Sequence, residues 1–487
     1  MGILLSRLIH DWKPTATRPV YKSLYQYLRE CIHSGEVVAG SIIPASRKLA
    51  VALSISRNTV NQAIEMLVSD GLLESRPGAG TFVSSGLDET VLKNARLIQE
   101  QDAKTPAISH RATEWLNVHR SKKVGLNAKA FAPGKPALDR FPFDIWARLL
   151  SRRWRLSGPS LAMAEDVKGY DLLRQHIARH LQASRGGQCD PDQIIITSGA
   201  QQGLDIIARV LWEEGDVIVT DDPSFPGISG VLSGAGVRQL TLPIDDEGIC
   251  LEGLEQDHKI KSFLVTPSRN YPLGVSLSLA RRMELLKTAR AHEAWVVEDD
   301  FDCDFRFDGP PLSSLQSVDG DGRVIYVGTF SRILFPALRL GFIVAPKQLV
   351  PTFEAAKSFM DGHASIVHQA ALADFFEEGY FHSHLRRMKK LYQTRRAFLV
   401  DWISRDLNDD LYVMPSDGGL HICVLFKQQR NDVTFAQKLA ENGVIVRPLS
   451  PFYKREKKKF GLVMGFAGYD EEELVKALVI VKKYLNL

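Results

Sequence analysis

Side chains that suit an anion are concentrated in one short stretch of the sequence, residues 328–342, which reads GTFSRILFPALRLGF. The hydroxyl groups of Thr329 and Ser331 and the guanidinium of Arg339 are hydrogen-bond donors that match a phosphate or a carboxylate. A second guanidinium, that of Arg332, lies in the same loop, where it neither belongs to an apolar face nor caps a helix. The stretch predicts an anion-binding loop that holds one arginine more than the anion needs.

Three other loops carry side chains that could bind a ligand, and each follows a short run of β-branched residues. Gly199 and Ala200 follow the run IIIT and lead into a helix, whose free N–H groups and dipole favour a phosphate. Phe225, which follows VIVT, offers a flat aromatic face. Asp299 and Asp300, which follow WVVE, offer carboxylates.

These loops are the ends of predicted strands. Helical stretches with one apolar face alternate with several of the runs, which is typical of a mostly parallel sheet covered on both faces by helices. In such a sheet the ligand lies beyond the carboxyl ends of the strands. We therefore predict one α/β domain over residues 126–487. Its runs are IIIT (194–197), VIVT (217–220), FLVT (263–266), WVVE (295–298), VIYV (324–327) and FIVA (342–345).

Residues 1–84 show short helices instead. Apolar residues recur at a helical period from Val20 to Ile32 and stop at Gly35. A second short apolar face, built by Leu49, Ala50 and Leu53, is followed by the tight turn Ser54-Ile55-Ser56. The spacing predicts two helices joined by a few residues.

Ser56 is placed to cap the helix that follows this turn. Arg57, Asn58 and Thr59 stay exposed at the start of that helix, where the side chains of a helix-turn-helix reach base edges and the helix N-terminus faces phosphate. The segment LLESRPGAGTFVSS then predicts a hairpin that turns at residues 77–80 and could serve as a wing. The buried face of the helix is predicted to carry Val60, Ala63, Ile64, Leu67 and Val68.

The charge of the chain agrees with a polyanion partner. The net charge of the 487 residues is +4, and residues 1–84 hold nine Lys and Arg against six Asp and Glu, a net of +3. The polar segment 85–125, with weak periodicity, is predicted to be a linker with some helical tendency.

The composition also bears on the class of protein. No apolar run is long enough to cross a bilayer, and the start of the chain shows no cleavage pattern of a signal peptide. The five cysteines are scattered and form no C-x-x-C pair, which argues against a disulfide framework and against a zinc site. We therefore expect a cytoplasmic protein without a metal site and without a membrane partner.

The order of motifs in residues 44–83 resembles the winged helix-turn-helix of the GntR family of bacterial repressors. The motifs are P-x-S-R-x-L-A, then S-R-N-T-V, then G-L-L-E-x-x-x-G-x-G-T-F-V. The resemblance implies a double-stranded operator DNA as partner. The residues that it implies for this contact are Arg47, Arg57, Asn58 and Thr59, capped by Ser56, with Gly80 shaping the wing.

The loops of residues 126–487, together with KGYDLLRQHIARHLQASRG (168–186), resemble the fold-type I, aspartate-aminotransferase-like family. Joined to a GntR-like head, the chain resembles the MocR/GabR-type regulators. That resemblance implies a homodimer built by the large domain, which senses pyridoxal phosphate and a small amino compound.

The resemblance also implies how the cofactor is held. The phosphate is assigned to Gly199, Ala200, Thr329, Ser331 and Arg339. Phe225 is assigned to the ring face and Asp299 to the pyridinium nitrogen. Two positions depart from the family: Phe301 replaces a tyrosine that donates to the phenolic oxygen, and Arg332 replaces the lysine that forms the imine.

The second departure has a chemical consequence. An imine needs an uncharged primary amine, whereas a guanidinium keeps its proton up to a pKa of roughly 12.5 or above. We therefore expect non-covalent binding of pyridoxal phosphate at most, no catalytic residue, and a regulator in place of an enzyme. The alternatives are an active aminotransferase that carries a DNA-binding module, and a regulator whose large domain only dimerises and binds no ligand.

Three points stay open from the sequence. Arg332 could bind the phosphate beside Arg339, or it could fill the pocket and exclude the cofactor. Arg447 could bind the carboxylate of a ligand or form a salt bridge at the rim. Val463 stands where many relatives carry an arginine for the substrate carboxylate.

Overall fold

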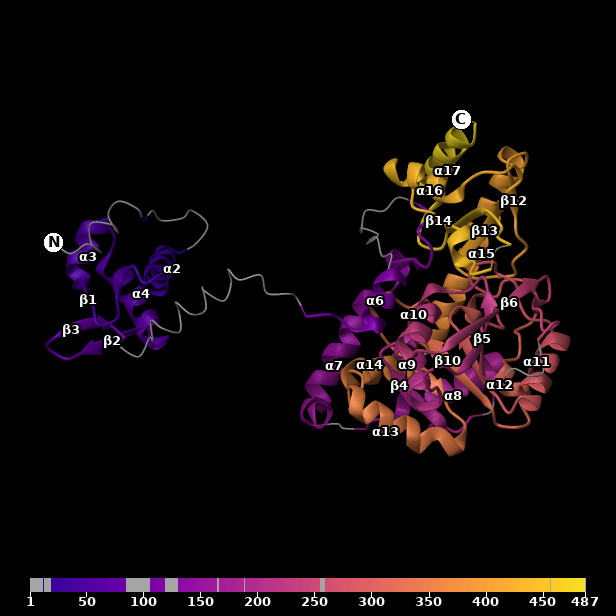
Figure 1. Cartoon of the computed structure of the whole chain (residues 1–487), viewed down its shortest axis with the longest axis horizontal. Coiled ribbons are helices and arrows are strands. Elements are labelled where there is room, and N and C mark those ends of the chain that lie inside the picture. Colours follow the sequence, from indigo (N-terminus) through magenta and orange to yellow (C-terminus); the bar gives the residue numbers. More distant parts are fainter. Residues whose placement is uncertain are drawn as a thin grey trace. The chain divides into compact units, whose positions relative to one another are not determined.

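The computed structural model describes two compact units, residues 1–107 and 108–487 (Figure 1). Its described residues are 12, 19–84, 106–118, 130–163, 166–187, 189–254, 259–455 and 457–486. The first eleven residues and most of the predicted linker, 85–105 and 119–125, lie outside them.

The first unit is a winged helix-turn-helix. Its amphipathic first helix buries Leu24, Leu28 and Ile32 against the other helices. Its three strands form one antiparallel sheet in the order β1-β3-β2. The elements are α2 (Val20–His33), β1 (Ile42–Ile43), α3 (Ser46–Leu53), α4 (Arg57–Ser69), β2 (Leu73–Arg76) and β3 (Gly80–Val83).

The turn between α3 and α4 follows from its two serines. Ser54 ends α3 with a φ of 54°, in the left-handed region, and so redirects the chain. The Ser56 side chain accepts a hydrogen bond from the backbone N–H of Thr59 at 3.1 Å, which caps α4 as predicted. Val60, Ala63 and Leu67 of α4 are buried, and the predicted Ile64 and Val68 are half-buried.

The core of the second unit is an eight-stranded sheet in the order β4-β11-β10-β9-β8-β5-β6-β7. Four neighbouring pairs are parallel, which confirms the predicted mostly parallel sheet. The pairs of β11 with β4 and β10, and of β6 with β7, are antiparallel. The strands are β4 (Ile194–Thr197), β5 (Val217–Asp222), β6 (Arg238–Asp245), β7 (Gly248–Ile249), β8 (Ile260–Val265), β9 (Trp295–Asp300), β10 (Val324–Thr329) and β11 (Gly341–Val344).

Each run read from the sequence overlaps one of these strands, but β6 and the two-residue β7 were missed. The residues of β6, RQLTLPID, are half-buried or exposed except for the buried Leu242, and they include a proline, so the strand has no continuous apolar run to mark it.

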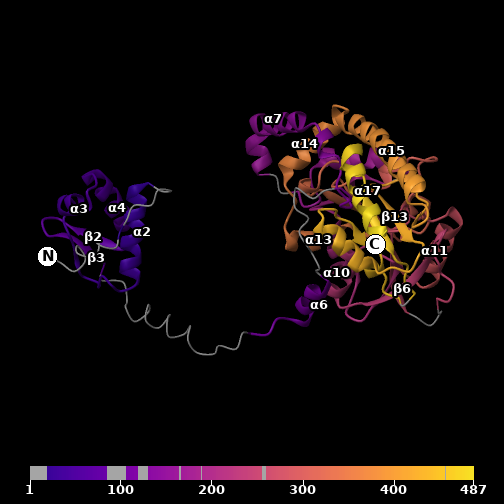
Figure 2. The same cartoon turned by 90° about the horizontal axis from the view of Figure 1, so that it is seen from above.

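Helices cover both faces of this sheet, because successive residues of a strand point to opposite faces. Ile194 and Ile196 of β4 pack with α7, α8, α14 and α15, whereas Ile195 between them packs with α9, α10 and α13. Helices α7 and α14 lie side by side, as Figure 2 shows. The helices of this part are α7 (Phe143–Ala162), α8 (Asp171–Arg185), α9 (Ala200–Leu211), α10 (Pro226–Ala235), α11 (Leu279–Ala291), α12 (Leu315–Val318), α13 (Val350–Met360), α14 (Ile366–Glu377) and α15 (Tyr380–Asp406).

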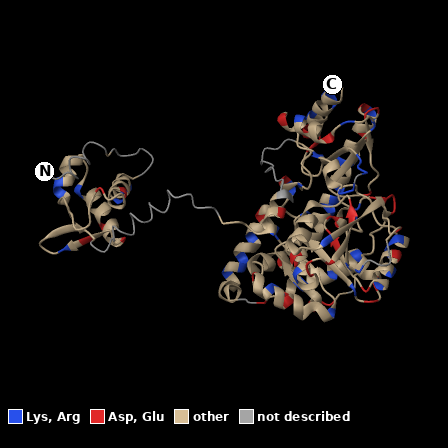
Figure 3. Ribbon diagram, viewed as in Figure 1, with Lys and Arg blue, Asp and Glu red and all other residues tan. Residues whose placement is uncertain are grey.

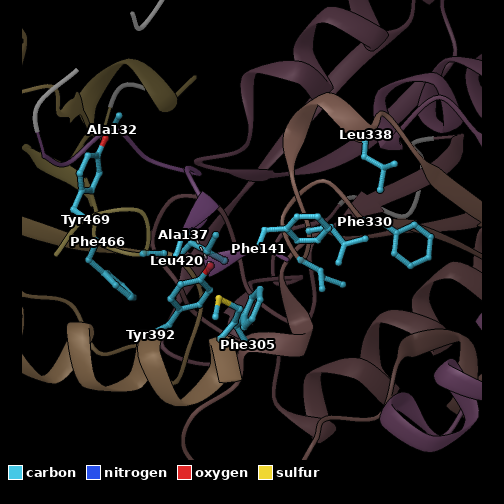
Figure 4. Close-up of a cluster of buried hydrophobic side chains, with 14 of the residues drawn as sticks. Ala132, Ala137, Phe141, Phe305, Phe330, Leu338, Tyr392, Leu420, Phe466 and Tyr469 are labelled. Atoms are coloured by element: carbon cyan, nitrogen blue, oxygen red, sulfur yellow. Dashed lines mark hydrogen bonds between the residues drawn. The ribbon is translucent and has the colours of Figure 1, made fainter. Parts of the chain in front are cut away.

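The C-terminal part adds a second, antiparallel sheet in the order β12-β13-β15-β14, which the sequence did not predict. A cluster of buried rings and aliphatic side chains joins it to α15 and to the segment around residues 130–141 (Figure 4). At its centre the hydroxyl of Tyr392 accepts a hydrogen bond from the backbone N–H of Ala137 at 2.9 Å. The elements are β12 (Leu411–Val413), β13 (His421–Phe426), α16 (Asp432–Glu441), β14 (Arg447–Pro448), β15 (Gly461–Gly465) and α17 (Glu471–Leu485).

One helix lies within the segment that was predicted as a linker. Helix α6 (His110–Val118) packs on α10 through Trp115. The indole N–H of Trp115 donates to the backbone oxygen of Gly230 at 2.9 Å. A Cβ on Gly234 would lie 3.0 Å from the Trp115 ring, so the glycine allows this close approach. This part of the segment is therefore attached to the second unit.

Across the described ranges, no helix is both long enough and apolar enough to cross a membrane.

Candidate functional site

The first candidate surface is the exposed start of α4. Arg57 and Asn58 are exposed, and Thr59 is half-buried with its hydroxyl 2.8 Å from that of Ser56. The Arg57 Nε donates to the Ser46 hydroxyl of α3 at 3.3 Å, which links the starts of the two helices. Arg47 is exposed at the first turn of α3. The ribbon of this part of the head carries blue Lys and Arg positions in Figure 3. The structure thus brings the predicted DNA-contacting side chains of both helices together.

The wing is the β2–β3 hairpin. Its strands pair from Leu73 opposite Val83 to Arg76 opposite Gly80, as the predicted turn requires. Gly80 has a φ of 118°, and a Cβ there would lie 3.3 Å from the Ile42 side chain. The positive φ therefore favours a glycine at this point of the wing.

The second candidate site begins where β4 ends. Gly199 precedes α9 with a φ of 96°, and a Cβ on it would lie 3.3 Å from the guanidinium of Arg339. The Arg339 Nη2 donates to the backbone oxygen of Ser198 at 2.8 Å, and Arg339 itself adopts a φ of 51°. The guanidinium therefore lies directly beside the N-terminus of α9, where an anion is favoured.

Two hydroxyls lie on the loop that follows β10. The Thr329 hydroxyl accepts a hydrogen bond from the backbone N–H of Ser331 at 3.2 Å. The Ser331 hydroxyl oxygen is buried and has no hydrogen-bond partner in the described residues. We use the name anion cradle for the group of Gly199, Ala200, Thr329, Ser331 and Arg339.

Asp299 lies at the end of β9, 5% exposed. Its Oδ1 has no hydrogen-bond partner among the described atoms. Burial first, and then the charge of Asp300, raise the pKa of Asp299 to about 7, although the charge of Arg332 acts to lower it. Asp300 has partners of its own, because it pairs with Arg185 and accepts from the Tyr326 hydroxyl at 2.9 Å. Asp299 is thus a buried acceptor that a ligand's N–H could satisfy.

The guanidinium of Arg332 lies against Gly134. A Cβ on Gly134 would lie 1.5 Å from the Arg332 Nη1, so only glycine leaves this space. No hydrogen bond or ion pair to the Arg332 side chain is found within the described ranges. Its positive charge lowers the pKa values of Asp299 and Asp302 against the effect of burial. The Arg339 guanidinium thus lies against Gly199, and the Arg332 guanidinium lies against Gly134.

The site also contains aromatic side chains. Phe225 is the N-cap residue of α10. Its ring meets the ring of Tyr271 edge-on, with 5.6 Å between the two centroids. Phe301 meets the same Tyr271 ring at 6.1 Å, and His421 meets it at 5.1 Å. Tyr271 therefore connects the predicted Phe225 and Phe301 to the second sheet through His421.

Several of these site residues were not predicted. Tyr271 and its neighbour Asn270 belong to the loop PSRNYPLG after β8. Asn270 donates to Asp221 at 3.2 Å, and one side-chain oxygen of each residue is buried without a partner. Because this loop directly follows a predicted strand, the sequence could have indicated both residues as candidates for the site. Gly134 and His421, in contrast, lie far from that loop in sequence and follow none of the predicted strand runs.

Comparisons with known proteins agree with this architecture. Residues 131–480 match the family described as aminotransferase class I and II, and residues 20–83 match the bacterial regulatory proteins of the gntR family. The chain is 26% identical to a kynurenine aminotransferase of Pyrococcus horikoshii, with a TM-score of 0.68 over 81% of this chain and 98% of that one. It is 25% identical to the α-aminoadipate aminotransferase LysN of Thermus thermophilus, with a TM-score of 0.71 over 78% and 97%. The chain therefore combines a gntR-type DNA-binding domain with an aminotransferase class I and II domain.

Relatives with this combination are named as regulators. The chain is 38% identical to the probable rhizopine catabolism regulatory protein MocR of Rhizobium meliloti, over 94% of this chain and 92% of the relative. It is 31% identical to the transcriptional regulator TauR of Rhodobacter capsulatus over 90% of both chains. It is 28% identical to the pyridoxine biosynthesis regulator PdxR of Corynebacterium glutamicum over 95% of both. The chain belongs to the MocR-type transcription regulators.

Proposed function

We propose that this DNA-binding regulator uses its aminotransferase-like domain to bind pyridoxal phosphate without a covalent bond and to sense a small amino compound. One observation carries the proposal: the Oδ1 of Asp299 and the hydroxyl of Ser331 are buried polar atoms without partners. Because a buried polar atom without a partner costs roughly 1–3 kcal/mol, a ligand that satisfies both would be stabilised. A phosphorylated pyridinium offers an acceptor for Ser331 and an N–H donor for Asp299.

The residues of the site suit the phosphate, the ring and the ring nitrogen of this cofactor, but none suits its aldehyde carbon. The anion cradle supplies the N-terminus of α9, the Ser331 hydroxyl and the Arg339 guanidinium for a phosphate. Phe225 lies at the start of α10 for the ring face. Pyridoxal phosphate, where bound, supplies an electron-withdrawing ring and an aldehyde. Arg332 offers no amine that can react with that aldehyde.

The same residue argues against an active aminotransferase as the function. An aminotransferase needs an uncharged amine that can attack a carbonyl carbon, and the family's position for it holds Arg332. The names of the relatives, which are transcription regulators, support the same view. A domain that only dimerises is disfavoured because it gives no reason for the unpartnered atoms of Asp299 and Ser331.

In the head, the proposed DNA contacts are those of the two helix starts. Arg57, Asn58 and Thr59 at the start of α4 are assigned to base edges, and Arg47 on α3 to the phosphate backbone. We assign residues 1–84 to the head and 126–487 to the effector-binding body. Of the segment 85–125 between them, helix α6 packs on the second unit.

The body is also proposed to form the homodimer. Large apolar side chains are exposed on α7 and α13, among them Leu156 at 77% and Phe359 at 92%. Large exposed apolar side chains are compatible with an interface formed by this body. A dimer would present two heads to two half-sites of an operator, and such a regulator acts on the chromosome in the cytoplasm.

Calorimetric titration tests the cofactor proposal. Pyridoxal phosphate is expected to bind the purified full chain reversibly, to be removed by gel filtration, and to stay removable after treatment with borohydride. Asp299→Asn and Arg339→Gln should each weaken binding by about tenfold or more, because each removes a charge-assisted contact. Arg405→Gln, an exposed arginine on α15, is the matched control. Absence of binding by the wild type, or cofactor fixed to it by borohydride, would refute the proposal.

A further inference from the structure

A dense run of positive charge lies on the surface of the second unit. Residues 454–459 read KREKKK, which is five Lys or Arg and one Glu, a net of +4. The whole chain has the same net charge, +4, so its other residues together carry no net charge. We use the name basic loop for residues 454–459, which lie between η6 (Ser450–Phe452) and β15.

The cationic side chains of the basic loop are open to solvent. All of its described residues are exposed: Lys454, Arg455, Lys457, Lys458 and Lys459. The Arg455 guanidinium donates to the backbone oxygen of Thr241 at 3.1 Å. Across the described ranges no hydrogen bond or ion pair to the four lysine side chains is found, whereas Lys168, Lys357 and Lys476 of the same unit each pair with a carboxylate. Four ammonium groups are thus left for a partner outside the chain.

Backbone hydrogen bonds hold both ends of the basic loop. The Asp222 carboxylate, buried at the end of β5, accepts from the backbone N–H of Lys454 at 2.7 Å and of Arg455 at 3.0 Å. After the loop, the backbone oxygen of Phe460 accepts from the N–H of Phe426 at 3.1 Å, and β15 follows. Since these anchors use no lysine side chain, the lysines can be replaced while the anchors stay.

Such a density of like charge is unfavourable in the free protein. Neighbouring ammonium groups repel one another, and interspersed charges of both signs would keep the surface soluble equally well. A run of this length that is rich in Lys and Arg is typical of surfaces that bind nucleic acid. A polyanion that neutralises the basic loop would therefore be bound favourably.

The types of side chain favour a phosphate backbone over the surface of another protein. Lysine is depleted at protein–protein interfaces, where arginine and aromatic side chains are enriched. Its ammonium group is a point charge, which suits a phosphate without demanding one fixed geometry. The basic loop also holds no Asn or Gln that could bind a base edge, which favours contact with the backbone of the duplex.

Duplex DNA is the polyanion that the gntR-type domain brings to this chain. We propose that the basic loop binds the phosphate backbone of duplex DNA, at phosphates that the head does not contact. The body thereby adds a contact to the operator complex that is independent of base sequence. This inference assigns the body a direct part in DNA binding, and it does not depend on the cofactor site.

The salt dependence of DNA binding tests this role. The affinity of the full chain for a duplex of about 60 base pairs and arbitrary sequence is measured by fluorescence anisotropy between about 50 and 200 mM KCl. The variant Lys457→Gln/Lys458→Gln/Lys459→Gln should bind about tenfold or more weakly than the wild type at about 100 mM KCl. Its slope of log affinity against log salt should be smaller in magnitude by about 2 to 3, because each phosphate contact contributes about 0.9.

Two matched variants separate the basic loop from a general charge effect. Lys457→Arg/Lys458→Arg/Lys459→Arg keeps the charge and should keep both the affinity and the slope. Arg405→Gln/Lys476→Gln/Lys483→Gln removes the same charge at scattered exposed positions of α15 and α17, and should leave the slope within about 0.5. Thermal melting checks that all three variants fold.

Acetylation of lysines in the wild type gives a direct readout of the contact. Bound DNA should slow the reaction of Lys457, Lys458 and Lys459 with an amine-acetylating reagent, as followed by mass analysis of their peptides. Lys483 should react equally fast with and without DNA. At about 1 M KCl, where charge interactions are screened within a few ångströms, the protection should disappear.

Three results would overturn this inference. The first is an unchanged slope in the triple glutamine variant, and the second is an equal change in the scattered control. The third is acetylation of the loop lysines that DNA does not slow, which would leave the basic loop to an acidic protein surface. Failure of the wild type to bind the duplex would overturn the inference together with the assignment of the head.

Discussion

Replacing Arg332 with lysine is the most direct way to examine the pocket, because it restores the one group that covalent attachment needs. The residues around this position are in place: the anion cradle, Asp299 at the end of β9 and Phe225 at the start of α10. A lysine at position 332 also removes a guanidinium that now lies against Gly134. We therefore expect the Arg332→Lys variant to turn yellow with pyridoxal phosphate and to keep the cofactor after borohydride reduction.

The size of the effect is limited by Phe301. The family's tyrosine at this position donates to the phenolic oxygen of the cofactor, and the Phe301 ring, edge-on to Tyr271, has no donor. A missing hydrogen bond of this kind costs about 1 kcal/mol, which corresponds to about fivefold in affinity. The double variant Arg332→Lys/Phe301→Tyr is therefore expected to bind the cofactor about fivefold more tightly than Arg332→Lys.

The carboxylates near position 332 set the pH at which the variant reacts. Asp299 and Asp302 both interact electrostatically with residue 332. In their ionised form they stabilise the ammonium form of a lysine, which cannot attack the aldehyde. Attachment should therefore be faster at about pH 9 than at about pH 7.

The assay is the visible absorption of the complex, followed by borohydride reduction and mass analysis of the peptide that contains residue 332. Arg455→Lys, which adds a lysine at an exposed position, is the control for attachment at an unrelated lysine. Cofactor trapped on the wild type would mean that another lysine serves. A colourless Arg332→Lys variant in excess cofactor would mean that the pocket is closed, and the reasoning about the anion cradle would be refuted.

Four further predictions concern the rest of the molecule. Arg57→Ala should weaken specific operator binding by roughly 1–3 kcal/mol, and the operator affinity of the wild type should fall steeply with added salt. Normal operator binding by the variant in a gel-shift assay would contradict the assignment of α4 as the recognition helix. The fragment 126–487 should sediment as a dimer at micromolar concentration, and a monomer would count against the proposed interface. In the folded chain, chiefly because of burial, the pKa of Asp299 is about 7, against an ordinary value of 3.8, so between about pH 4 and about pH 7 the folded chain holds a proton that the unfolded chain has lost. The free energy of unfolding should therefore fall as pH rises through this window. Denaturant melts of Asp299→Asn should show a shallower fall, and an unchanged pH profile would exclude Asp299 as the source of the pH dependence. Trp115→Ala removes the hydrogen bond to Gly230 and the ring packed at Gly234, so amide exchange in residues 110–118 should become faster; unchanged exchange would show that other contacts hold α6.

Much of the fold could be predicted because its signals are local. The capping serine of α4 and the exposed residues after it need only neighbours in sequence, and the structure confirms the cap. The apolar runs of β4, β5 and β9 are continuous because both faces of those strands are buried. Strand β6, exposed at several positions, and the short strands of the C-terminal sheet lack that signal and were missed.

The sequence by itself determined the two kinds of domain, the loops that carry Gly199, Asp299 and Ser331, and the absence of a reactive amine at position 332. Each depends on residue type and order, which the chain states directly. Only the tertiary structure decided that the Arg332 guanidinium lies against Gly134 and the Arg339 guanidinium against Gly199. It also decided that Arg447 stands across from Val463 and that Tyr271 joins the two sheets. Those facts depend on contacts between segments far apart in the chain, and strand register and side-chain packing set them after the local elements have formed.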